Sequence, residues 1–366
     1  MVTLFLAGDV MTGRGIDQIL PHPSQPRIYE DYATSALEYV ALAERAHGTI
    51  PRPVDFPYVW GDALDVLSFR NPDLRIVNLE TAVTTSGSPE PKGINYRMHP
   101  GNIGVLKAAH IDCCALANNH VLDWGEPGLL DTLDILKGTG ILTAGAGRDG
   151  VEAARPAVIH ASSACRVLIF SLGMESSGIP PHWAAGAARP GIRFLPDLSE
   201  RMADSLTAEI NSLRRPGDIV VVSIHWGSNW GYEIPAPHER FAHALIDLGA
   251  CDILHGHSSH HARAIEIYRQ KLILYGCGDF INDYEGISGR EEYRGYLSPM
   301  YLAEFDESAG KLSCLTIVIF KMHRFRLRHA PSEDVKWLMH TLNPYNKEFG
   351  TELHLNRDGS LEAAHL

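Results

Sequence analysis

Short apolar segments alternate with amphipathic segments over roughly the first 280 residues of the chain. Runs of apolar and β-branched residues predict buried β-strands at 2–7, 74–79, 113–117, 141–144, 167–171, 219–224, 251–254 and 272–275. Amphipathic periodicity, with proline near the start or glycine just after the end, predicts helices at 126–137, 199–214 and 237–248. Strands that alternate with helices in this way are typical of an α/β fold.

Two parts of the chain depart from this alternation. Residues 21–60 contain six prolines around one helix-like stretch at 30–46, and we interpret them as an insertion packed over the edge of the main sheet. After residue 286 the pattern predicts a strand at 315–320, a basic edge strand at 321–328, a helix that starts near Ser332 and a hairpin around 358–359. We therefore expect one domain over residues 1–285, with residues 286–366 packed on it.

Composition narrows the classes of protein that fit. The 366 residues carry a net charge of −12, which argues against a general nucleic-acid binder because phosphate binding needs a basic face. No apolar run approaches the roughly 18 residues of a membrane-spanning helix, and the N-terminal apolar run is too short and lacks the basic leader of a secretory signal. The six cysteines show no CxxC spacing, so we expect reduced thiols in a cytoplasmic protein.

Six of the predicted strands are followed by side chains that can bind a metal ion. These are Asp9, Glu80, Asn119 with His120, His225, His257 with His260, and Asp279. One such residue alone is weak evidence, since an aspartate after a strand is as readily a turn former and a lone histidine is more often structural. Strand ends on one edge of a sheet converge, however, and carboxylates and imidazoles buried together repel one another and lose hydration. A divalent cation offsets that cost, so we expect a metal site.

The strongest signal is the segment 251–261, which reads CDILHGHSSHH. Four of its last seven residues are histidines, and imidazole is the commonest protein ligand of metal ions. The segment reads as a buried strand followed by a loop, and open α/β sheets place their sites at such strand ends. The alternative is a polar surface loop that is rich in histidine by chance.

The expected donors are oxygen and nitrogen atoms without a thiolate. Such a set suits Mn, Fe or Zn, and fits neither a cysteine-rich zinc site nor an all-oxygen calcium site. One or two divalent ions are compatible with it, and two ions need a bridging carboxylate, for which Asp9 or Glu80 is suitable. Such centres polarise an ester oxygen and produce a hydroxide nucleophile near neutral pH. His120 is then a candidate catalytic residue, as general acid or transition-state donor.

Arginines and aromatic residues supply candidates for substrate binding. Arg14 lies in a glycine-rich turn, where a guanidinium can clamp a phosphate or carboxylate and act as a catalytic group; the alternative is a surface arginine. Arg97 is a weaker candidate of the same kind. Trp226, Trp230 and Tyr232 share one loop, and they form either an aromatic wall for the substrate or core contacts under that loop.

Six short motifs match, in order, those of one known family. They are residues 8–11 (GDVM) with Arg14, 78–80 (NLE), 117–120 (ANNH), 225–227 (HWG), 256–260 (GHSSH) and 278–280 (GDF). In these motifs the chain resembles the CapA family, the poly-γ-glutamate capsule-synthesis proteins, which belong to the calcineurin-like metallophosphoesterase superfamily. The resemblance covers roughly residues 1–285. It implies a four-layer α/β/β/α sandwich, two central sheets flanked by helices, with the metal site at their edge.

The resemblance also groups the metal ligands. It implies one site formed by Glu80, Asn119, His225 and His257, and a weaker site formed by Asp9, His260 and Asp279. The chain departs from the pattern at four points: Met11 replaces the histidine of Asp-x-His, Glu80 replaces an aspartate, an extra residue separates His257 from His260, and Asp279 replaces an asparagine. Because Met11 removes a ligand, both mononuclear and dinuclear binding stay open.

Three functions are compatible with these features. The first is a soluble metal-dependent hydrolase that uses metal-activated water on a phosphoester or a γ-glutamyl-type amide, with a small anionic or polyglutamyl substrate. The second is a non-catalytic, metal-containing component of poly-γ-glutamate or capsule polymer synthesis that binds an acidic polymer. The lack of a membrane anchor favours the first, whereas Met11 favours the second. The third is a metal-free α/β binding domain. Substrate, metal and oligomeric state stay open.

Overall fold

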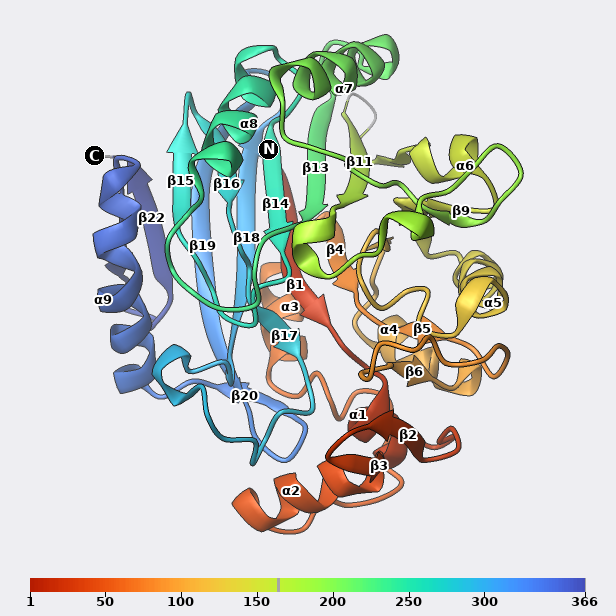
Figure 1. The fold of residues 1–366 in the computed structure, drawn as a ribbon. Helices are drawn as coiled ribbons and strands as arrows, with labels where there is room; N and C mark the ends of the chain where they lie inside the picture. Colours follow the sequence, from red (N-terminus) through yellow and green to blue (C-terminus); the bar gives the residue numbers. More distant parts are fainter. Residues whose placement is uncertain (163–164, 366) are drawn as a thin grey trace.

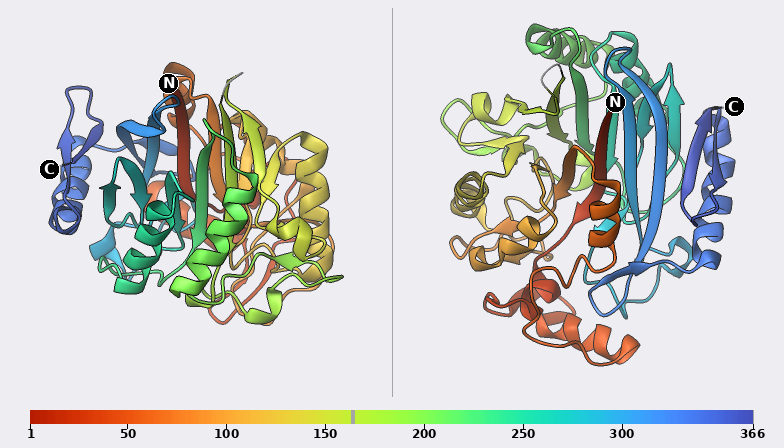
Figure 2. Two further views of the ribbon diagram at one scale, coloured as in Figure 1. Left: turned by 90° about the horizontal axis from the view of Figure 1, so that it is seen from above. Right: turned by 180° about the vertical axis from the view of Figure 1, so that it is seen from behind.

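Two β-sheets stacked face to face form the centre of the molecule, with helices on their outer faces (Figures 1 and 2). The computed structural model describes residues 1–162 and 165–365. Within these residues the larger sheet has ten strands. Eight of them follow the order β21 (Thr351–Leu355), β22 (Leu361–His365), β19 (Lys311–Met322), β18 (Leu297–Asp306), β1 (Val2–Val10), β4 (Leu74–Leu79), β7 (Cys113–Ala115) and β8 (Leu142–Ala144). The other two are β17 (Asp279–Ile281), which pairs with β1, and β20 (Leu327–His329), which pairs with β19.

The second sheet has six described strands. Their order is β10 (Ala157–His160), β11 (Arg166–Gly173), β13 (Ile219–His225), β14 (Ile253–His257), β16 (Lys271–Leu274) and β15 (Ile265–Tyr268). Three small ribbons lie outside the main sheets: β2 (Arg27–Glu30) with β3 (Ala33–Ser35), β5 (Ala82–Val83) with β6 (Arg97–Met98), and β9 (Ala146–Gly147) with β12 (Gly191–Ile192).

The helices form the outer layers. The outer face of the larger sheet, which points away from the smaller sheet, is covered by five helices: α1 (Arg14–Ile19), α2 (Leu37–His47), α3 (Ala63–Arg70), α4 (Gly104–Ala108) and α5 (Gly125–Thr139). The six-stranded sheet is covered by α7 (Glu200–Leu213) and α8 (Ala236–Asp247). The short α6 (Gly150–Ala154) packs on β9, and α9 (Ser332–Glu348) packs along β21 at one end of the sandwich.

Side chains of the central strands alternate between two cores. In β1, Leu4 and Leu6 face the core between the sheets, whereas Phe5 and Ala7 face the helices outside the larger sheet. Residues of β11 and β13 divide in the same way between the inner core and the helices α7 and α8. A strand covered on both faces needs apolar side chains at every position, so these segments read as unbroken apolar runs. The predicted four-layer α/β/β/α class is confirmed.

The strand order brings the ends of distant segments together. Strands β1, β4 and β7 are parallel neighbours in one sheet, and β13 and β14 are parallel neighbours in the other. After β16 the chain leaves the smaller sheet and enters the larger one as β17, which pairs in parallel with β1 and sets Asp279 opposite Asp9. Side chains that follow strands of both sheets can therefore meet at one edge of the sandwich.

The helix expected over residues 30–46 is wrong in its first part. Residues 27–35 form the hairpin β2–β3, and α2 begins only at Leu37. Within the hairpin Ile28 and Glu30 face inward, while their neighbours are exposed. This alternation has the period of a strand, and Glu30 faces inward because it is the ion-pair partner of the buried Arg14.

The C-terminal part contains one element that was not expected and one that differs from expectation. The ten-residue strand β18 joins β1 to β19. The basic segment 321–328 is not a single edge strand, because β19 ends at Met322 and the chain reverses before β20. Phe325, in the middle of this turn, is fully buried and fixes the reversal. The helix from Ser332 and the hairpin around residues 358–359 are confirmed as α9 and β21–β22.

Two further expectations concern reduced cysteines and membrane-spanning helices. All six cysteines are free thiols and five of them are buried, as expected. In the part of the chain that the structure describes, every helix falls short of the length and apolarity needed to cross a bilayer.

We expect Ile169→Ala to lower the free energy of unfolding by about 2–5 kcal/mol, because it leaves a cavity between the two sheets. Urea denaturation followed by circular dichroism measures this loss. Val158→Ala is the control, since Val158 is 38% exposed on the neighbouring strand β10, and its effect should stay within about 0.5 kcal/mol. Equal losses in the two variants would contradict a closely packed core at this position.

Candidate metal centre

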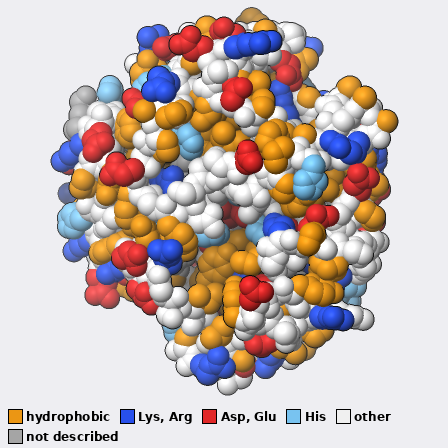
Figure 3. All heavy atoms as spheres, viewed as in Figure 1, with side chains coloured by type: hydrophobic (Ala, Val, Ile, Leu, Met, Phe, Trp, Pro, Cys, Tyr) orange, Lys and Arg blue, Asp and Glu red, His pale blue; other side chains and the backbone are white. Residues whose placement is uncertain are grey.

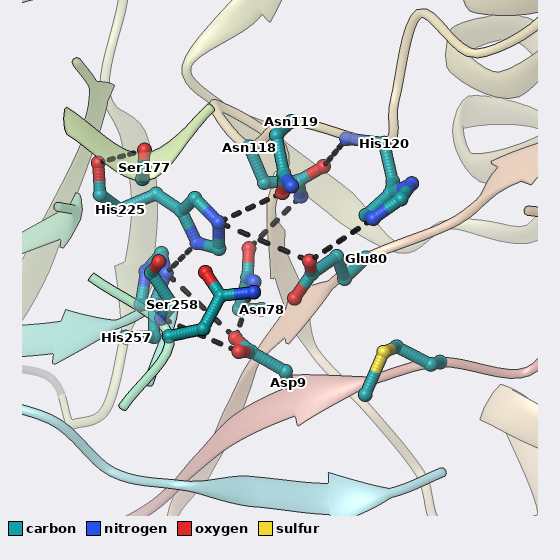
Figure 4. A network of polar contacts seen from close by, with 12 residues as sticks. Asp9, Asn78, Glu80, Asn118, Asn119, His120, Ser177, His225, His257 and Ser258 are labelled. Carbon is teal, nitrogen blue, oxygen red and sulfur yellow. Dashed lines mark hydrogen bonds and ion pairs between the residues drawn. The ribbon is translucent and has the colours of Figure 1, made fainter. Parts of the chain in front are cut away.

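The predicted donors converge at the edge where the two sheets meet. Figure 4 shows five of them, Asp9, Glu80, Asn119, His225 and His257, with their side chains pointing toward a common centre. The predicted donors come from both sheets. The larger sheet contributes Asp9 in β1, Glu80 after β4, Asn119 after β7 and Asp279 in β17. The smaller sheet contributes His225 in β13, His257 in β14 and His260 in the loop after β14. Figure 3 shows a hollow in this face with histidine and acidic side chains at its floor. Five of the seven side chains are buried; Asn119 and His260 are partly exposed.

Two groups of three residues have the spacing of metal ligands. In the first, ligand atoms of Asp9, His225 and His257 all lie within 4.8 Å of one another. In the second, the same holds for Asp9, His260 and Asp279. Asp9 belongs to both groups, as a bridging carboxylate would.

The first group is held by hydrogen bonds among the histidines and their neighbours. His225 Nδ1 lies 2.7 Å from His257 Nδ1, so one of the two nitrogens carries the shared hydrogen. His225 Nε2 lies 2.9 Å from Asn119 Oδ1 and 3.9 Å from Glu80 Oε1. On its far side His257 Nε2 contacts the Ser223 hydroxyl at 2.7 Å, which turns Nδ1 of His257 toward the centre. Ser223 thus orients a candidate ligand, as outer-layer partners do in metal sites.

The two remaining histidines of the loop have structural contacts instead. His255 Nε2 donates to the Ala7 carbonyl oxygen of the opposite sheet at 2.9 Å. His261 donates from Nδ1 to the Ala262 carbonyl oxygen and stacks on Tyr293. The loop is therefore not a polar surface segment, and two of its four histidines, His257 and His260, belong to the centre.

Three carboxylates share this buried space. Burial, and then the charge of Asp279, raise the pKa of Asp9 to about 7. Burial and the charge of Asp9 raise the pKa of Glu80 well above its ordinary value, and Glu80 Oε2 has no hydrogen-bond partner among the described residues. A buried carboxylate oxygen without a partner is costly, which fits a cation at this position.

The imidazoles have the complementary property. Burial lowers the pKa of His225 and His257 well below the ordinary value, so both are neutral and have lone pairs to donate at pH 7. Burial also lowers the pKa of His260, but the charge and hydrogen bond of Asp279, 3.0 Å away, outweigh it and raise this pKa. Neutral imidazoles beside acidic oxygens fit a divalent cation of the Mn, Fe or Zn type.

Two asparagines connect the ligands behind the centre. Asn78 donates from Nδ2 to Asp9 Oδ1 at 2.7 Å, and Asn118 donates to Asn78 Oδ1 at 3.0 Å. Asn118 Oδ1 also accepts from the backbone N–H of His120 at 3.1 Å. The three strand ends β1, β4 and β7 are thereby held in one hydrogen-bonded chain.

His120 faces Glu80 and has a carboxylate behind it. Its Nε2 lies 3.7 Å from Glu80 Oε1, and its Nδ1 lies 2.6 Å from Asp123 Oδ2. Lys92 pairs with Asp123 at 2.7 Å and also donates to the Asn119 carbonyl oxygen. Burial lowers the pKa of His120 to about 4 despite Asp123. The sequence analysis did not identify Lys92 or Asp123 as site residues. Asp123 could have been found, because it follows His120 by three residues, whereas Lys92 lies in a loop without a recognisable pattern.

The expected role of Arg14 does not agree with the structure. Arg14 is only 3% exposed, and the Cζ atom of its guanidinium lies 3.5 Å from the centroid of the Tyr39 ring. Nε and Nη2 donate to Asp283 at 2.8 and 2.5 Å, and Nη1 donates to Glu30 at 2.9 Å. Two buried carboxylates therefore neutralise the guanidinium, and it is neither a surface arginine nor a free anion clamp.

The aromatic candidates separate into core and surface. Trp226 is 2% exposed, stacks on His238 and donates to the Tyr275 carbonyl oxygen, so the core alternative is the correct one for it. Tyr232 is half-buried and stacks on Tyr345. Trp230 lines a cavity of about 280 Å³ that also includes His260.

Arg97 is the last of the substrate candidates. Its guanidinium lies 3.8 Å from the centroid of the Trp124 ring. It therefore packs on an aromatic side chain, and its contacts within the described residues do not reach the candidate ligands.

Together these features define a four-layer α/β/β/α protein with a centre of carboxylate, imidazole and amide groups at the edge of its two sheets. Residues 3–284 match the family model described as bacterial capsule synthesis protein PGA_cap, and the chain belongs to this family. The CapA resemblance is thus confirmed.

The relatives carry names related to polymer synthesis. A Mycobacterium tuberculosis protein named "probable polyglutamine synthesis accessory protein" is 47% identical over 99% of this chain and 96% of its own length. The capsule biosynthesis protein CapA of Bacillus anthracis is 24% identical over 77% of this chain and 60% of its own length. The PGA biosynthesis protein CapA of Bacillus subtilis is 28% identical over 75% of this chain and 62% of its own length.

A solved structure titled as a novel phosphatase, from Mycoplasma pneumoniae, aligns over 90% of this chain and 95% of its own with a TM-score of 0.46 and 13% identity.

Asp283→Asn should lower the free energy of unfolding by about 3–5 kcal/mol, because it leaves the buried Arg14 with one carboxylate partner. The matched control is Asp134→Asn, which breaks the exposed Arg148–Asp134 pair and should cost at most about 1 kcal/mol. Thermal and urea unfolding of both variants measure the difference. Similar small losses would mean that Arg14 does not depend on Asp283.

The raised pKa of Asp9 predicts a pH dependence in metal-free protein. Between its ordinary value of 3.8 and about 7, folded Asp9 binds a proton that the unfolded chain has released, so this contribution to stability is lost as pH rises through that window. Asp9→Asn does not ionise and should gain stability relative to wild type as pH rises, by at most about 1.4 kcal/mol per pH unit. Urea unfolding in chelator at several pH values tests this. A constant difference between the two proteins from acid to neutral pH would refute it.

Proposed function

We propose that the protein is a metal-dependent hydrolase that acts on a phosphoester or a γ-glutamyl-type amide. The observation that carries this proposal is the pair of ligand groups that share Asp9, next to the hydrogen-bonded pair His120 and Asp123. An ion-binding group and a proton-transfer group at one hollow are the two parts that such a hydrolysis needs.

The proposed ligands divide into two sets with Asp9 in common. Asp9, His225 and His257, with Glu80 and Asn119 beside them, are suited to one ion. Asp9, His260 and Asp279 are suited to a second. A bound divalent cation supplies Lewis-acid polarisation of a substrate oxygen and makes water a nucleophile near neutral pH.

His120 is the residue that we propose to move the proton. Its Nδ1–H donates to Asp123, which fixes the tautomer and leaves the Nε2 lone pair facing the centre. Since the pKa of His120 is about 4, the side chain is neutral at pH 7, and its Nε2 first accepts a proton from the attacking water rather than donating one. It then returns that proton to the leaving group, so its role as general acid follows a step as general base. Asp123 is a positioning residue in this scheme.

The substrate class follows from the surroundings. The ammonium of Lys92, held by Asp123 and the Asn119 carbonyl oxygen, places a positive charge beside His120 and favours an anionic substrate. The cavity that contains Trp230 and His260 adjoins the second ligand set and has room for the part of the substrate away from the bond that is cut. The names of the relatives support a polyglutamyl or other capsule-related polymer as the natural substrate.

The second candidate is a non-catalytic component of polymer synthesis that binds an acidic chain through its metal. Met11 favours it, because a methionine replaces a ligand of the superfamily pattern, and so does the word "accessory" in the name of the mycobacterial relative. Both candidates need the metal, but only the first needs His120.

The number of metal ions bound per chain distinguishes these two candidate functions, which both need a metal, from a metal-free binding domain. We expect one or two tightly held equivalents of Mn, Fe or Zn in protein purified without chelator, reduced by at least one equivalent in His257→Ala and unchanged in the exposed-site control His160→Ala. Elemental analysis by mass spectrometry measures this. Wild type that neither holds nor takes up these metals would exclude both candidates.

Hydrolysis then decides between the two. The metal-loaded wild type should cleave phosphoesters or γ-glutamyl amides, and His120→Asn should retain its metal but lose about 10²–10⁴-fold in rate. Turnover of neither substrate class by fully loaded protein would favour the binding component.

A further inference from the structure

Two histidines and a glutamate converge at a second place that shares no residue with the candidate metal centre. His47 is the last residue of α2, Glu285 lies in the loop after β17, and His323 lies in the turn between β19 and β20. One ligand atom from each lies within 4.8 Å of the others. Figure 1 shows α2 beyond the end of the sheets, beside the loops that carry the other two residues.

The two imidazole rings are adjacent but not paired with each other. Their centroids are 4.7 Å apart and their planes are tilted by 50°. His47 Nδ1 lies 2.6 Å from Glu285 Oε1. Within the described residues neither ring nitrogen of His323 makes a hydrogen bond, although the ring is held beside His47.

Glu285 is fixed in place by the turn that carries His323. Its side chain is 2% exposed, and its two oxygens accept the backbone N–H groups of Arg324 at 2.7 Å and Phe325 at 2.5 Å. Both of these residues have positive φ, 57° and 54°, which is costly for side chains of this size. Ligating carboxylates are commonly held by such hydrogen bonds.

A purely structural role explains part of this arrangement. Glu285 would cap the turn and His47 would be its exposed ion-pair partner. That account leaves out His323, whose ring is placed against His47 without a hydrogen bond.

We propose that His47, Glu285 and His323 bind a divalent transition-metal ion, with Zn²⁺, Co²⁺ or Ni²⁺ as the suitable class. Two imidazole nitrogens and one carboxylate oxygen are a ligand set that these ions accept, and solvent completes the coordination because His47 is 37% exposed. The ion replaces the hydrogen that His47 now shares with Glu285. It ties α2, within the segment 21–60, to the β19–β20 turn.

The site also has a structural connection to the proposed function without depending on it. Glu285 lines the cavity of about 280 Å³ that includes Trp230 and His260. A metal ion on Glu285 would therefore stiffen one wall of that cavity. Since the site is at the surface and has three protein ligands, we expect its ion to be lost in chelator and regained from solution.

The test uses Zn²⁺ and the full chain in an Asp9→Asn/His257→Ala background, stripped with chelator, because Asp9 belongs to both ligand groups of the candidate metal centre and His257 to the first. Isothermal titration calorimetry should detect one equivalent of Zn²⁺ at this site. Adding His323→Ala, or separately His47→Gln, should weaken that affinity by at least about 100-fold, since even outer-layer partners of a metal contribute about 10–100-fold. Adding His160→Ala should leave it unchanged, because His160 is exposed and outside the cluster.

Thermal unfolding in chelator checks that the variants fold, and His47→Gln retains a hydrogen-bond donor to Glu285 if His323→Ala proves unstable. Zn²⁺ should then raise the melting temperature of the Asp9→Asn/His257→Ala protein and not of the variants that also carry His323→Ala or His47→Gln. Unchanged Zn²⁺ affinity in both of these variants, or no Zn²⁺ binding in the Asp9→Asn/His257→Ala protein, would overturn the proposal. Because the background already lacks Asp9 and His257, neither result bears on the proposed hydrolase.

Discussion

The structure depends on one costly arrangement: three carboxylates, Asp9, Glu80 and Asp279, share a buried space where the two sheets meet. Like charges that have lost their hydration repel one another, and the cost is lowered by protons on Asp9 and Glu80, whose pKa values are raised, or by a bound cation. The arrangement follows from topology, because the parallel pairing of β17 with β1 sets Asp279 opposite Asp9. Neighbouring amides lessen the cost without removing it, since Asn78 and the Ser258 N–H each donate to one oxygen of Asp9, whereas Glu80 Oε2 has no partner among the described residues.

The candidate centre depends on the stacking of the two sheets. The ligands come from both sheets, so neither sheet alone contains a complete group. Two hydrogen bonds cross directly between the sheets beside the ligands: His255 Nε2 donates to the Ala7 carbonyl oxygen, and the Ser258 N–H donates to Asp9 Oδ2 at 3.3 Å. The apolar core between the sheets therefore positions the chemistry as well as stabilising the fold.

The features that the sequence predicts well are those set by neighbouring residues in the chain. An apolar run that ends in a polar residue identifies a strand and its donor within a few positions, which is why the seven converging side chains could be predicted. The pattern alone predicted only an α/β class, and the four-layer order followed from the family resemblance. Side-chain partners are not local. Arg14 is neutralised by Asp283, 269 positions away, and Lys92 reaches His120 from a loop without a pattern. Trp226 packs on His238 of α8 and Trp230 lines a cavity although they are four residues apart, because their partners are distant in the sequence.

Met11 stands where the superfamily pattern described above has a histidine. Its sulfur lies 3.7 Å from the Tyr284 hydroxyl and is enclosed by protein, so position 11 offers the centre no nitrogen or carboxylate oxygen. The second ligand group is nevertheless complete without it, because β17 delivers Asp279 alongside Asp9 and the loop after β14 delivers His260. The extra serine between His257 and His260 contributes to this, as Ser258 adopts a φ of 105° and its N–H turns to Asp9. Asp279 and the longer loop are two further departures from the pattern of the resemblance, and together they bring a carboxylate and an imidazole beside Asp9.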